Sequence, residues 1–316
     1  MTKRMLLIII ALLVVVDIVA AFWYLALRIE SSGQSGDIFV RAETDVAAQA
    51  DTVIDSSLPD AFVVSRDEAF FVSQEAAGTE RGQLLSVKRV TRRWPRSING
   101  CDSLVNIERE LVRIAFSRSY GTVTEAVNFF LSEPQFNYGN GLAFTRVVQV
   151  PAAVPAKNRN VRHVLIYPYS TSFQLLVMEI DHYGYSGDGW SKRSAYVVYD
   201  RVRQRVLDRD KMLVPEQETA LLAVLNKKIA HINQTQHLDL LSASQVPVEV
   251  CPKRTGMVFE FQEGDIAPSS KGVIDVLIDY PTLKPYLTDA FRNIVNSNDG
   301  YWEYKALRPD DAAPTE

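Results

Sequence analysis

An apolar run near the N-terminus, Met5 to Leu27, restricts what this chain can fold into more than any other feature. It is 23 residues long and carries one charge, Asp17. At ~1.5 Å per residue, a helix of that length reaches roughly 34 Å, which is enough to cross a hydrocarbon core of about 30 Å. We therefore expect Met5 to Leu27 to be a transmembrane anchor in contact with membrane lipid.

The residues that flank the run predict its orientation. Lys3 and Arg4 precede it, and positive charges beside a span stay in the cytoplasm. The aromatic sequence FWY at 22–24 lies toward the other end, where such rings prefer the lipid–water boundary. Residues 1–4 are then a cytoplasmic stub, and the bulk of this single-pass membrane protein is periplasmic or otherwise extracytoplasmic.

Two features of the run have more than one interpretation. The small residues Val-Ala-Ala at 19–21 fit a cleavage site, so a cleaved signal peptide is the alternative to an anchor. Asp17 is a costly carboxylate near the middle of the span. It either contacts a partner helix in the membrane or is tolerated in a single span by protonation or snorkelling. No cysteine lies near the run, which argues against a lipoprotein.

The rest of the chain is mildly acidic. Beyond Arg28 it has 31 basic and 37 acidic residues, because Lys3, Arg4, Arg28 and Asp17 account for the rest of the totals of 34 and 38. Phosphate binding draws on a basic surface, so we expect no nucleic-acid partner. With 47% hydrophobic and 23% charged residues, the composition is that of an ordinary folded protein.

Two cysteines, Cys101 and Cys251, lie 150 positions apart. In an oxidising envelope compartment such a pair favours a disulfide over a metal site. The bond would tie an early segment to a late one. Two separate buried thiols are the alternative, because only the distance between the two residues decides whether they can pair.

Polar stretches divide the chain into regions. Residues 28–60 lack a sustained apolar period and predict a stalk or linker. Strand and helix patterns are then interspersed without a regular βαβ rhythm. This predicts an α+β fold of two packed subdomains, at 61–160 and 161–296, followed by a flexible tail at 297–316.

Side-chain periodicity predicts the individual elements. β-rich runs predict strands at 61–65, 69–75, 83–90, 142–155, 161–170, 173–187, 195–200, 246–251, 256–262 and 272–280. Apolar residues at helical spacing predict helices at 102–116, 123–131, 215–233 and 288–295. Asp102 or Ser103 can cap the first of these helices, and Thr122 with Glu125 has the spacing of a capping box. The segments RRWPRSINGCDS at 92–103 and YSGDGWSKRS at 185–194 are predicted loops.

Three segments resemble a known family of envelope domains, found in RsiV-type anti-sigma factors and PdaC-type peptidoglycan deacetylases. TGMVFEFQEGDIAPSSKGVIDVLIDYPTLKPYL at 255–287 is similar to the C-terminal signature, with its corner at residues 265–268 and Gly272 beyond it. YGYSGDGWSKRSAYVVYDRVRQRVLDRDKML at 183–213 resembles the tyrosine-rich strand, glycine loop and following strand. WPRSINGCDSLVNIERELVRIAFSRSYGTVTEAVNFFL at 94–131 resembles the N-terminal partner region.

The resemblance covers about residues 60 to 295 and implies an RsiV C-terminal-like domain at 161–296. In the anti-sigma members the outer domain recognises lysozyme and a cytoplasmic segment holds the sigma factor. Residues 1–4 are too few for a sigma-binding fold, so we do not expect sigma control. The glycine loop at 187–191 lacks the histidine found in many relatives, and no role of that histidine carries over.

Asp181 and His182 form the most suggestive cluster for chemistry. A histidine beside carboxylates can act as a general base or metal ligand, or be a side chain at a strand end. The four histidines are scattered without an HxH or HxxxH pattern. We therefore expect no metal, no cofactor and no catalytic residue. The carboxylates of Asp188, Glu263 and Asp265 fit ordinary turn positions.

The aromatic residues beside the glycine loop are candidate binding residues. Tyr183, Tyr185 and Trp190 can present rings to a sugar or a protein, or they can pack into the sheet. The full candidate ligand-binding set is Asp181, His182, Tyr183, Tyr185, Asp188 and Trp190.

The leading hypothesis is a membrane-anchored envelope protein whose non-enzymatic exterior domain binds a lysozyme-like protein or a cell-wall glycan such as peptidoglycan. One alternative is an enzyme that modifies envelope polysaccharide, with Asp181, His182 and Asp188 near its site. Another is a structural subunit of a membrane complex that contacts its partner through Asp17.

The orientation generates a first prediction. A protease added to intact cells, with access to the outer face of the inner membrane, will digest the C-terminal part of the protein, because the charge of Lys3 and Arg4 keeps only the stub inside. Immunoblotting against the C-terminus measures this. A C-terminus that is protected in intact cells and digested only after lysis would contradict the orientation.

Overall fold

The computed structural model describes residues 60–73, 83–98, 104–134, 143–150, 154–186, 189–296 and 301–304. Contacts divide the chain into two units, Met1–Ala42 and Glu43–Glu316, and every described residue lies in the second unit. The expected anchor and Asp17 therefore lie outside the described residues. Within those ranges, none of the helices is long and apolar enough to cross a membrane.

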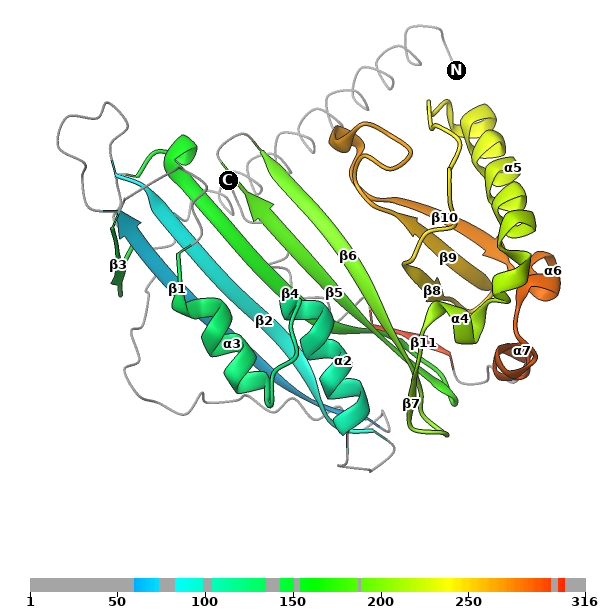
Figure 1. Cartoon of the computed structure of the whole chain (residues 1–316), viewed down its shortest axis with the longest axis horizontal. Helices are drawn as coiled ribbons and strands as arrows, with labels where there is room; N and C mark the ends of the chain where they lie inside the picture. The colour runs from blue at the N-terminus through cyan, green and yellow to red at the C-terminus, as the bar shows by residue number, and fades with distance from the viewer. Residues whose placement is uncertain are drawn as a thin grey trace, which may run out of the picture. The chain divides into compact units, whose positions relative to one another are not determined.

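The fold is α+β and is built on one large sheet (Figure 1). Its main path runs in the order β3-β1-β2-β4-β5-β6-β7, and β11 also pairs with β4. The neighbours are antiparallel except for β2 and β4, which are parallel. The strands are β1 (Ala61–Ser73), β2 (Leu85–Ser97), β3 (Phe144–Val147), β4 (Arg159–Thr171), β5 (Leu175–Tyr185), β6 (Trp190–Asp200), β7 (Arg205–Leu207) and β11 (Trp302–Glu303).

The first strand replaces two predicted shorter ones. Polar residues between the two apolar runs look like a turn in the sequence, but they belong to β1. Glu68 forms ion pairs with Arg66 and with Arg89 of β2, and Asp67 pairs with Arg92 at 3.5 Å. These cross-strand pairs provide partners for the charges, so the strand continues through them.

The predicted loop at 92–103 is wrong in its first half, because β2 runs on through Ser97. Trp94 is buried, and its ring N–H donates a hydrogen bond of 2.9 Å to Glu108 on the helix above. Pro95 is tolerated because the pairing of β2 with β4 ends at Arg92, so its missing N–H costs no bond on that side.

Two helices cover one face of the large sheet (Figure 1). They are α2 (Val105–Phe116) and α3 (Val123–Ser132). The expected cap of α2 is not observed, since Leu104 occupies the cap position and no side chain caps the helix. The expected capping box of α3 is confirmed: Thr122 accepts from the N–H of Glu125, whose carboxylate accepts from the N–H of Gly121, both at 3.1 Å.

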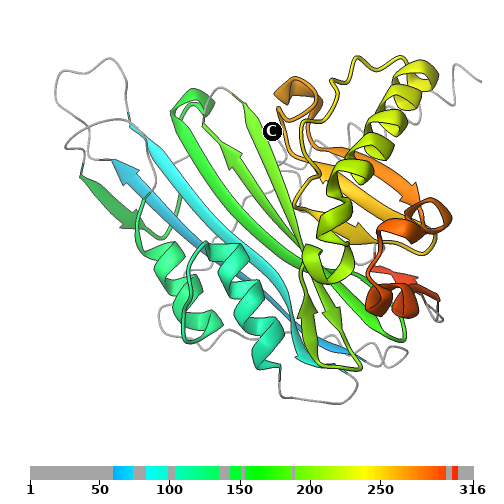
Figure 2. The ribbon, with the colours of Figure 1, turned by 45° about the vertical axis from the view of Figure 1, so that its right-hand side comes forward.

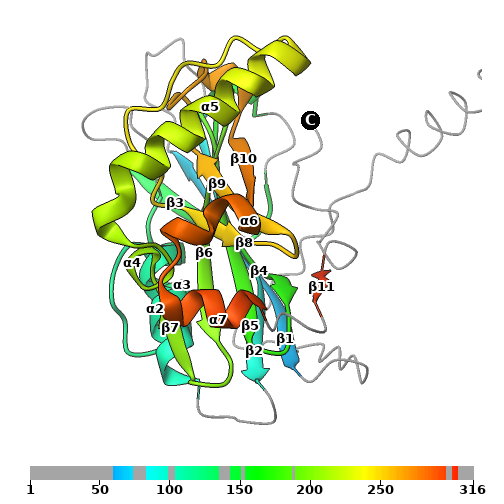
Figure 3. The same ribbon diagram turned by 90° about the vertical axis from the view of Figure 1, so that its right-hand side faces the viewer.

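The opposite face of β5 and β6 packs against a second, smaller sheet. This sheet has the order β10-β9-β8, and α5 covers its outer side (Figures 2 and 3). The elements of this part are β8 (Val250–Pro252), β9 (Gly256–Phe261), β10 (Ile274–Asp279), α4 (Arg209–Met212), α5 (Glu218–Gln236), α6 (Tyr280–Leu283) and α7 (Asp289–Asn296). Short 3-10 turns lie at Ala156–Asn158, Pro215–Gln217, Ser269–Lys271 and Lys284–Tyr286.

The two hydrophobic cores therefore lie on the two faces of the same sheet. Leu175 and Val177 of β5 face the small sheet, while Leu176 and Met178 of the same strand face α2 and α3. The expected subdomain boundary at residue 160 falls inside the large sheet, at the start of β4. Part of the expected tail is also in the fold, because β11 pairs with β4 and Tyr304 is buried in the core under the helices.

The structure does not show the expected disulfide. Cys251 of β8 is a free, fully buried thiol, and Cys101 lies outside the described residues. Burial raises the pKa of the Cys251 thiol well above its ordinary value, and nearby carboxylates add to the rise. This thiol is therefore neutral in the fold and packs as a small apolar side chain.

A buried ion pair connects the start of β1 to the far side of the sheet. The guanidinium of Arg201, just after β6, lies 2.8 Å from the carboxylate of Asp60, and both side chains are almost completely buried. Arg201 also donates hydrogen bonds to the carbonyl oxygen of Ser172 and the hydroxyl of Thr171. The pair joins residues 141 positions apart.

This pair generates a second prediction. Asp60→Ala will lower the free energy of unfolding by about 3–5 kcal/mol, because it leaves a buried guanidinium without its countercharge. Denaturant unfolding followed by circular dichroism measures the loss. Asp289→Asn is the control, because the Asp289 carboxylate pairs with Arg292 but is 92% exposed, and its loss should cost at most about 1 kcal/mol. A similar small loss for both variants would refute the role of the buried pair.

Candidate functional site

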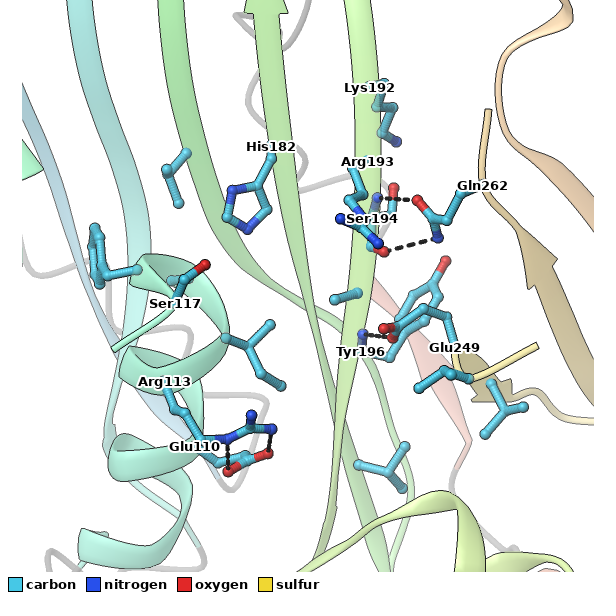
Figure 4. Close-up of a pocket in the computed structure, with 18 of the residues that line it drawn as sticks. Glu110, Arg113, Ser117, His182, Lys192, Arg193, Ser194, Tyr196, Glu249 and Gln262 are labelled. Atoms are coloured by element: carbon cyan, nitrogen blue, oxygen red, sulfur yellow. Dashed lines mark hydrogen bonds and ion pairs between the residues drawn. The ribbon is translucent and has the colours of Figure 1, made fainter. Parts of the chain in front are cut away.

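A cleft of about 1420 Å³ runs along the edge of β6. Its walls are the C-terminal half of α2, the ends of β4 and β5, the segment before β8 and the turn after β9. Figure 4 shows part of it, with α2 on one side of β6 and Glu249 and Gln262 on the other. The molecule has two packing units, which are the large sheet with α2 and α3 and the small sheet with α5. Both packing units contribute residues to this one concave surface.

The cleft exists where β6 lacks a strand neighbour. On one side β6 pairs with β5 over its whole length, but on the other it pairs with β7 only at Val198–Asp200. The outward N–H groups of Lys192, Ser194 and Tyr196 would be unsatisfied there. Instead they donate to the side chains of Glu263, Gln262 and Glu249, at 2.7, 3.2 and 3.1 Å respectively.

Asp181 lies under this edge in a buried polar network. Its carboxylate accepts hydrogen bonds from the hydroxyls of Ser194 at 2.6 Å and of Tyr167 and Tyr183 at 3.2 Å. The ammonium of Lys192 lies 3.0 Å from it. Burial lowers the pKa of Lys192, but Asp181 and its neighbours outweigh burial and raise the pKa above its usual value. Asp181 is thus a fully satisfied structural anion.

A second buried acid sits beside this network on β9. Glu260 accepts hydrogen bonds from the hydroxyl of Tyr196 at 2.7 Å and the side-chain amide of Gln262 at 2.9 Å. Burial raises the pKa of Glu260 to about 7, against the lowering effect of these hydrogen bonds. Burial also raises the pKa of the Tyr196 hydroxyl, which stays protonated and keeps donating. Glu249 shows the same tendency, because burial raises its pKa.

The side chain of His182 leaves β5 on the opposite face from that of Asp181. Successive side chains of a strand point to opposite faces, so His182 lies on the α2 side, whereas Asp181 faces the small sheet. Figure 4 shows His182 above the end of α2 that carries Ser117. Burial lowers the pKa of His182; Asp181 and a hydrogen bond to the backbone of Ile114 raise it, and Arg193 and Arg162 lower it further. The imidazole is therefore neutral at pH 7.

The aromatic residues of the β5–β6 hairpin lie partly in the cleft and partly at the end of the hairpin. Tyr183 lines the cleft, where its hydroxyl is held by Asp181 and the Lys192 ammonium lies 5.6 Å from its ring centre. Tyr185 and Trp190 pack on each other with ring centroids 4.9 Å apart, and Trp190 is 40% exposed. Trp190 and its neighbours begin β6, so the predicted loop at 185–194 is strand in its second half.

The structure thus separates the sequence-predicted set. His182 and Tyr183 line the cleft, Asp181 is buried beneath it, Tyr185 and Trp190 lie at the hairpin end, and Asp188 lies outside the described residues. Sequence reasoning missed further lining residues, namely Arg113, Arg162, Lys192, Arg193, Glu249 and Gln262. If the segment at 190–200 had been predicted as a strand, the alternation of side chains would have placed Lys192 and Arg193 on opposite faces of the sheet. No sequence signal places Gln262 against Ser194.

Among the described residues, no group of three or more His, Cys, Asp and Glu side chains is placed to hold a metal ion. His163, which also lines the cleft, lies 3.0 Å from the hydroxyl of Thr91 through its Nε2 atom. His231 and His237 belong to α5 and its C-cap, away from the residues that line the cleft.

Comparison with known proteins bears on the fold of this chain. No protein-family model and no curated protein sequence matches the chain. The fold is similar to that of a solved structure from the DUF3298 family, a domain family of unknown function.

Two solved structures are similar to this chain. A DUF3298 family member from Bacteroides fragilis aligns with a TM-score of 0.50 and 12% identity, covering 74% of this chain and 96% of that chain. A DUF3298 protein from Pseudomonas aeruginosa aligns with a TM-score of 0.48 and 17% identity, with the same coverage. The first likeness shows a shared fold, and a shared fold does not by itself define a function.

The acid network generates a third prediction. Glu260 has a pKa of about 7 in the fold against 4.5 in an unfolded chain, so its protonated form is favoured by folding. Its contribution to the free energy of unfolding is complete below pH 4.5 and is lost as the pH rises through 7. Glu260→Gln should therefore be more stable than the unmodified protein at pH 8, by roughly 1–3 kcal/mol.

Chemical denaturation at several pH values between 4 and 8 measures this effect. The control is Glu216→Gln, because Glu216 is exposed in the turn before α5. The control variant should keep the pH profile of the unmodified protein. The assignment is wrong if the Glu260→Gln profile is equally steep between pH 4.5 and 7.

Proposed function

We propose that this chain is a membrane-anchored envelope protein whose exterior domain is a non-enzymatic binding module. Its ligand is a protein of the lysozyme type or a cell-wall glycan such as peptidoglycan, and it binds in the cleft along β6. The anchor at Met5–Leu27, the outward orientation and the resemblance to RsiV- and PdaC-type domains belong to this proposal.

One observation carries the proposal: a cleft of about 1420 Å³ is lined by both polar and apolar side chains from both packing units. Binding sites are concave surfaces in which a few placed polar groups set specificity. Phe116, Phe130 and Tyr183 supply rings, and the side chains of Arg162, Ser191 and Arg193 supply polar groups. The volume suits a ligand of several sugar units or a protein loop.

The arrangement of Asp181 and His182 supports binding over catalysis. A general base and the acid that orients it must lie within hydrogen-bond reach of one another. Here the two side chains leave β5 on opposite faces, and Asp181 already accepts from three hydroxyls. The pair therefore does not form an acid–base couple, and no other observation favours the polysaccharide-modifying alternative.

A cleft variant gives the fourth prediction. Val248 lines the cleft and is 71% exposed, so Val248→Arg adds a bulky charged side chain to the cleft without burying it. We expect at least about a tenfold loss of retained ligand, which corresponds to about 1.4 kcal/mol. The measurement is a pull-down of the soluble residues 30–316 against lysozyme and against peptidoglycan fragments.

Leu241→Arg is the matched control, because Leu241 is 66% exposed and does not line the cleft. It should retain ligand like the unmodified protein. Retention of neither probe by the unmodified protein, or equal losses in the two variants, would overturn the proposal.

A further inference from the structure

Two guanidinium groups in the cleft make no hydrogen bond or ion pair with any residue that the structure describes. Arg162 of β4 and Arg193 of β6 both line it. Among the described residues, neither side chain makes a hydrogen bond or an ion pair, and the Nε atom of Arg162 is buried without an acceptor. A buried donor without an acceptor costs about 1–3 kcal/mol, so the free protein carries a cost that a bound acceptor would remove.

No acid that lines the cleft forms an ion pair with these arginines, although the charge of Arg193 lowers the pKa of Glu249. Six carboxylates line it, and each is already held by another group. The pairs are Glu110 with Arg113, Asp208 with Lys211, Asp210 with Arg209, Glu249 with the N–H of Tyr196, Glu263 with the N–H of Lys192, and Asp265 with the N–H of Gln262. Within the described residues, the guanidinium charges of Arg162 and Arg193 are therefore not neutralised by an ion pair.

The strand register brings the two arginines to one place on the α2 face. Arg193 lies directly opposite His182, and Arg162 lies directly opposite Gly184. His182 and Gly184 point to the same face of β5 and are separated by about 7 Å along the strand. Long side chains reach across such a diagonal. Arg162, His182 and Arg193 thus surround one area of the cleft wall.

Gly184 makes room for this arrangement. A Cβ atom at this position would lie 2.8 Å from Nη1 of Arg162 and 2.9 Å from Oγ of Ser191. Both distances are shorter than a carbon atom tolerates, so the guanidinium lies over the backbone of Gly184 where any other residue would displace it. Ser191 adds a hydroxyl to the same area, 3.4 Å from the carbonyl oxygen of Gly184.

The neutral imidazole of His182 is consistent with its position between Arg162 and Arg193. Burial lowers its pKa, and the nearby charges of Arg193 and Arg162 lower it further. An uncharged ring avoids repulsion between directly opposite cations, and its single N–H donates to the backbone of Ile114.

We propose that Arg162 and Arg193, on either side of His182, form a binding site for an oxyanion, a carboxylate or a phosphate, that is part of the ligand of the cleft. Planar guanidinium groups bind both oxyanions through two parallel N–H donors. The site deepens the proposed binding function and rests on it for the rest of the ligand, but the anion contact can be tested alone.

The fifth prediction concerns small anions. Titration of the full-length protein in detergent with inorganic phosphate and, separately, with acetate should shift the NMR signals of the His182 ring in a saturable way for at least one of them. Chloride at equal ionic strength should not. The stronger of the two probes identifies the class of oxyanion.

Arg193→Gln, at an exposed position, should weaken binding of that probe at least about tenfold, because it removes charge-assisted hydrogen bonds to the anion. Arg162→Gln with Arg193→Gln should abolish it. The matched control is Lys227→Gln, which removes one positive charge at an exposed position of α5 outside the cleft and should leave the affinity unchanged.

The outcomes separate the two proposals. No saturable shift with either probe, or unchanged affinity in Arg193→Gln, overturns the oxyanion site even if lysozyme or peptidoglycan is retained. Saturable binding that is lost in Arg193→Gln supports the site, including when both larger ligands fail. In that case only the proposed ligand class is refuted.

Discussion

The exposed edge of β6 is the constraint on which the rest of the structure depends. Three outward N–H groups lack a neighbouring strand, and each is satisfied by a side chain from the small-sheet part, Glu249, Gln262 or Glu263. A strand in that place would lie about 4.8 Å away and fill the space. Side chains reach further than backbone pairing, so they connect the two parts of the molecule while the cleft between them stays open.

The alternation of side chains across β5 and β6 then distributes the charges. On the small-sheet face, Asp181 and Glu260 are buried, and hydroxyls, an amide and Lys192 surround them. On the helix face, Arg162 and Arg193 have no acid partner among the described residues. The acids that hold the fold together and the arginines of the proposed oxyanion site therefore lie on opposite faces of the same strands.

The fold is shared with a DUF3298 family structure at 12% identity, which leaves the chemistry of the site to this chain's own residues. The cleft lies along the edge of β6. The side chains that accept from the N–H groups of this edge come from the segments before β8 and after β9, and the arginines Arg162 and Arg193 come from β4 and β6. A ligand bound there would contact both packing units. Binding would therefore oppose their separation and stabilise the whole domain.

Local patterns determined much of this protein. Thr122 and Glu125 predicted the start of α3, the spacing of Leu221, Leu225 and Ile229 predicted α5, and three alternating runs predicted the strands that form the small sheet. Each of these signals lies within a few residues. Only the tertiary structure decided the continuity of β1, the extension of β2 through Trp94, and the separation of Asp181 from His182. It also placed Gln262 beside Ser194 and Arg162 over Gly184. These contacts join residues distant in sequence, and no local preference specifies which strands become neighbours.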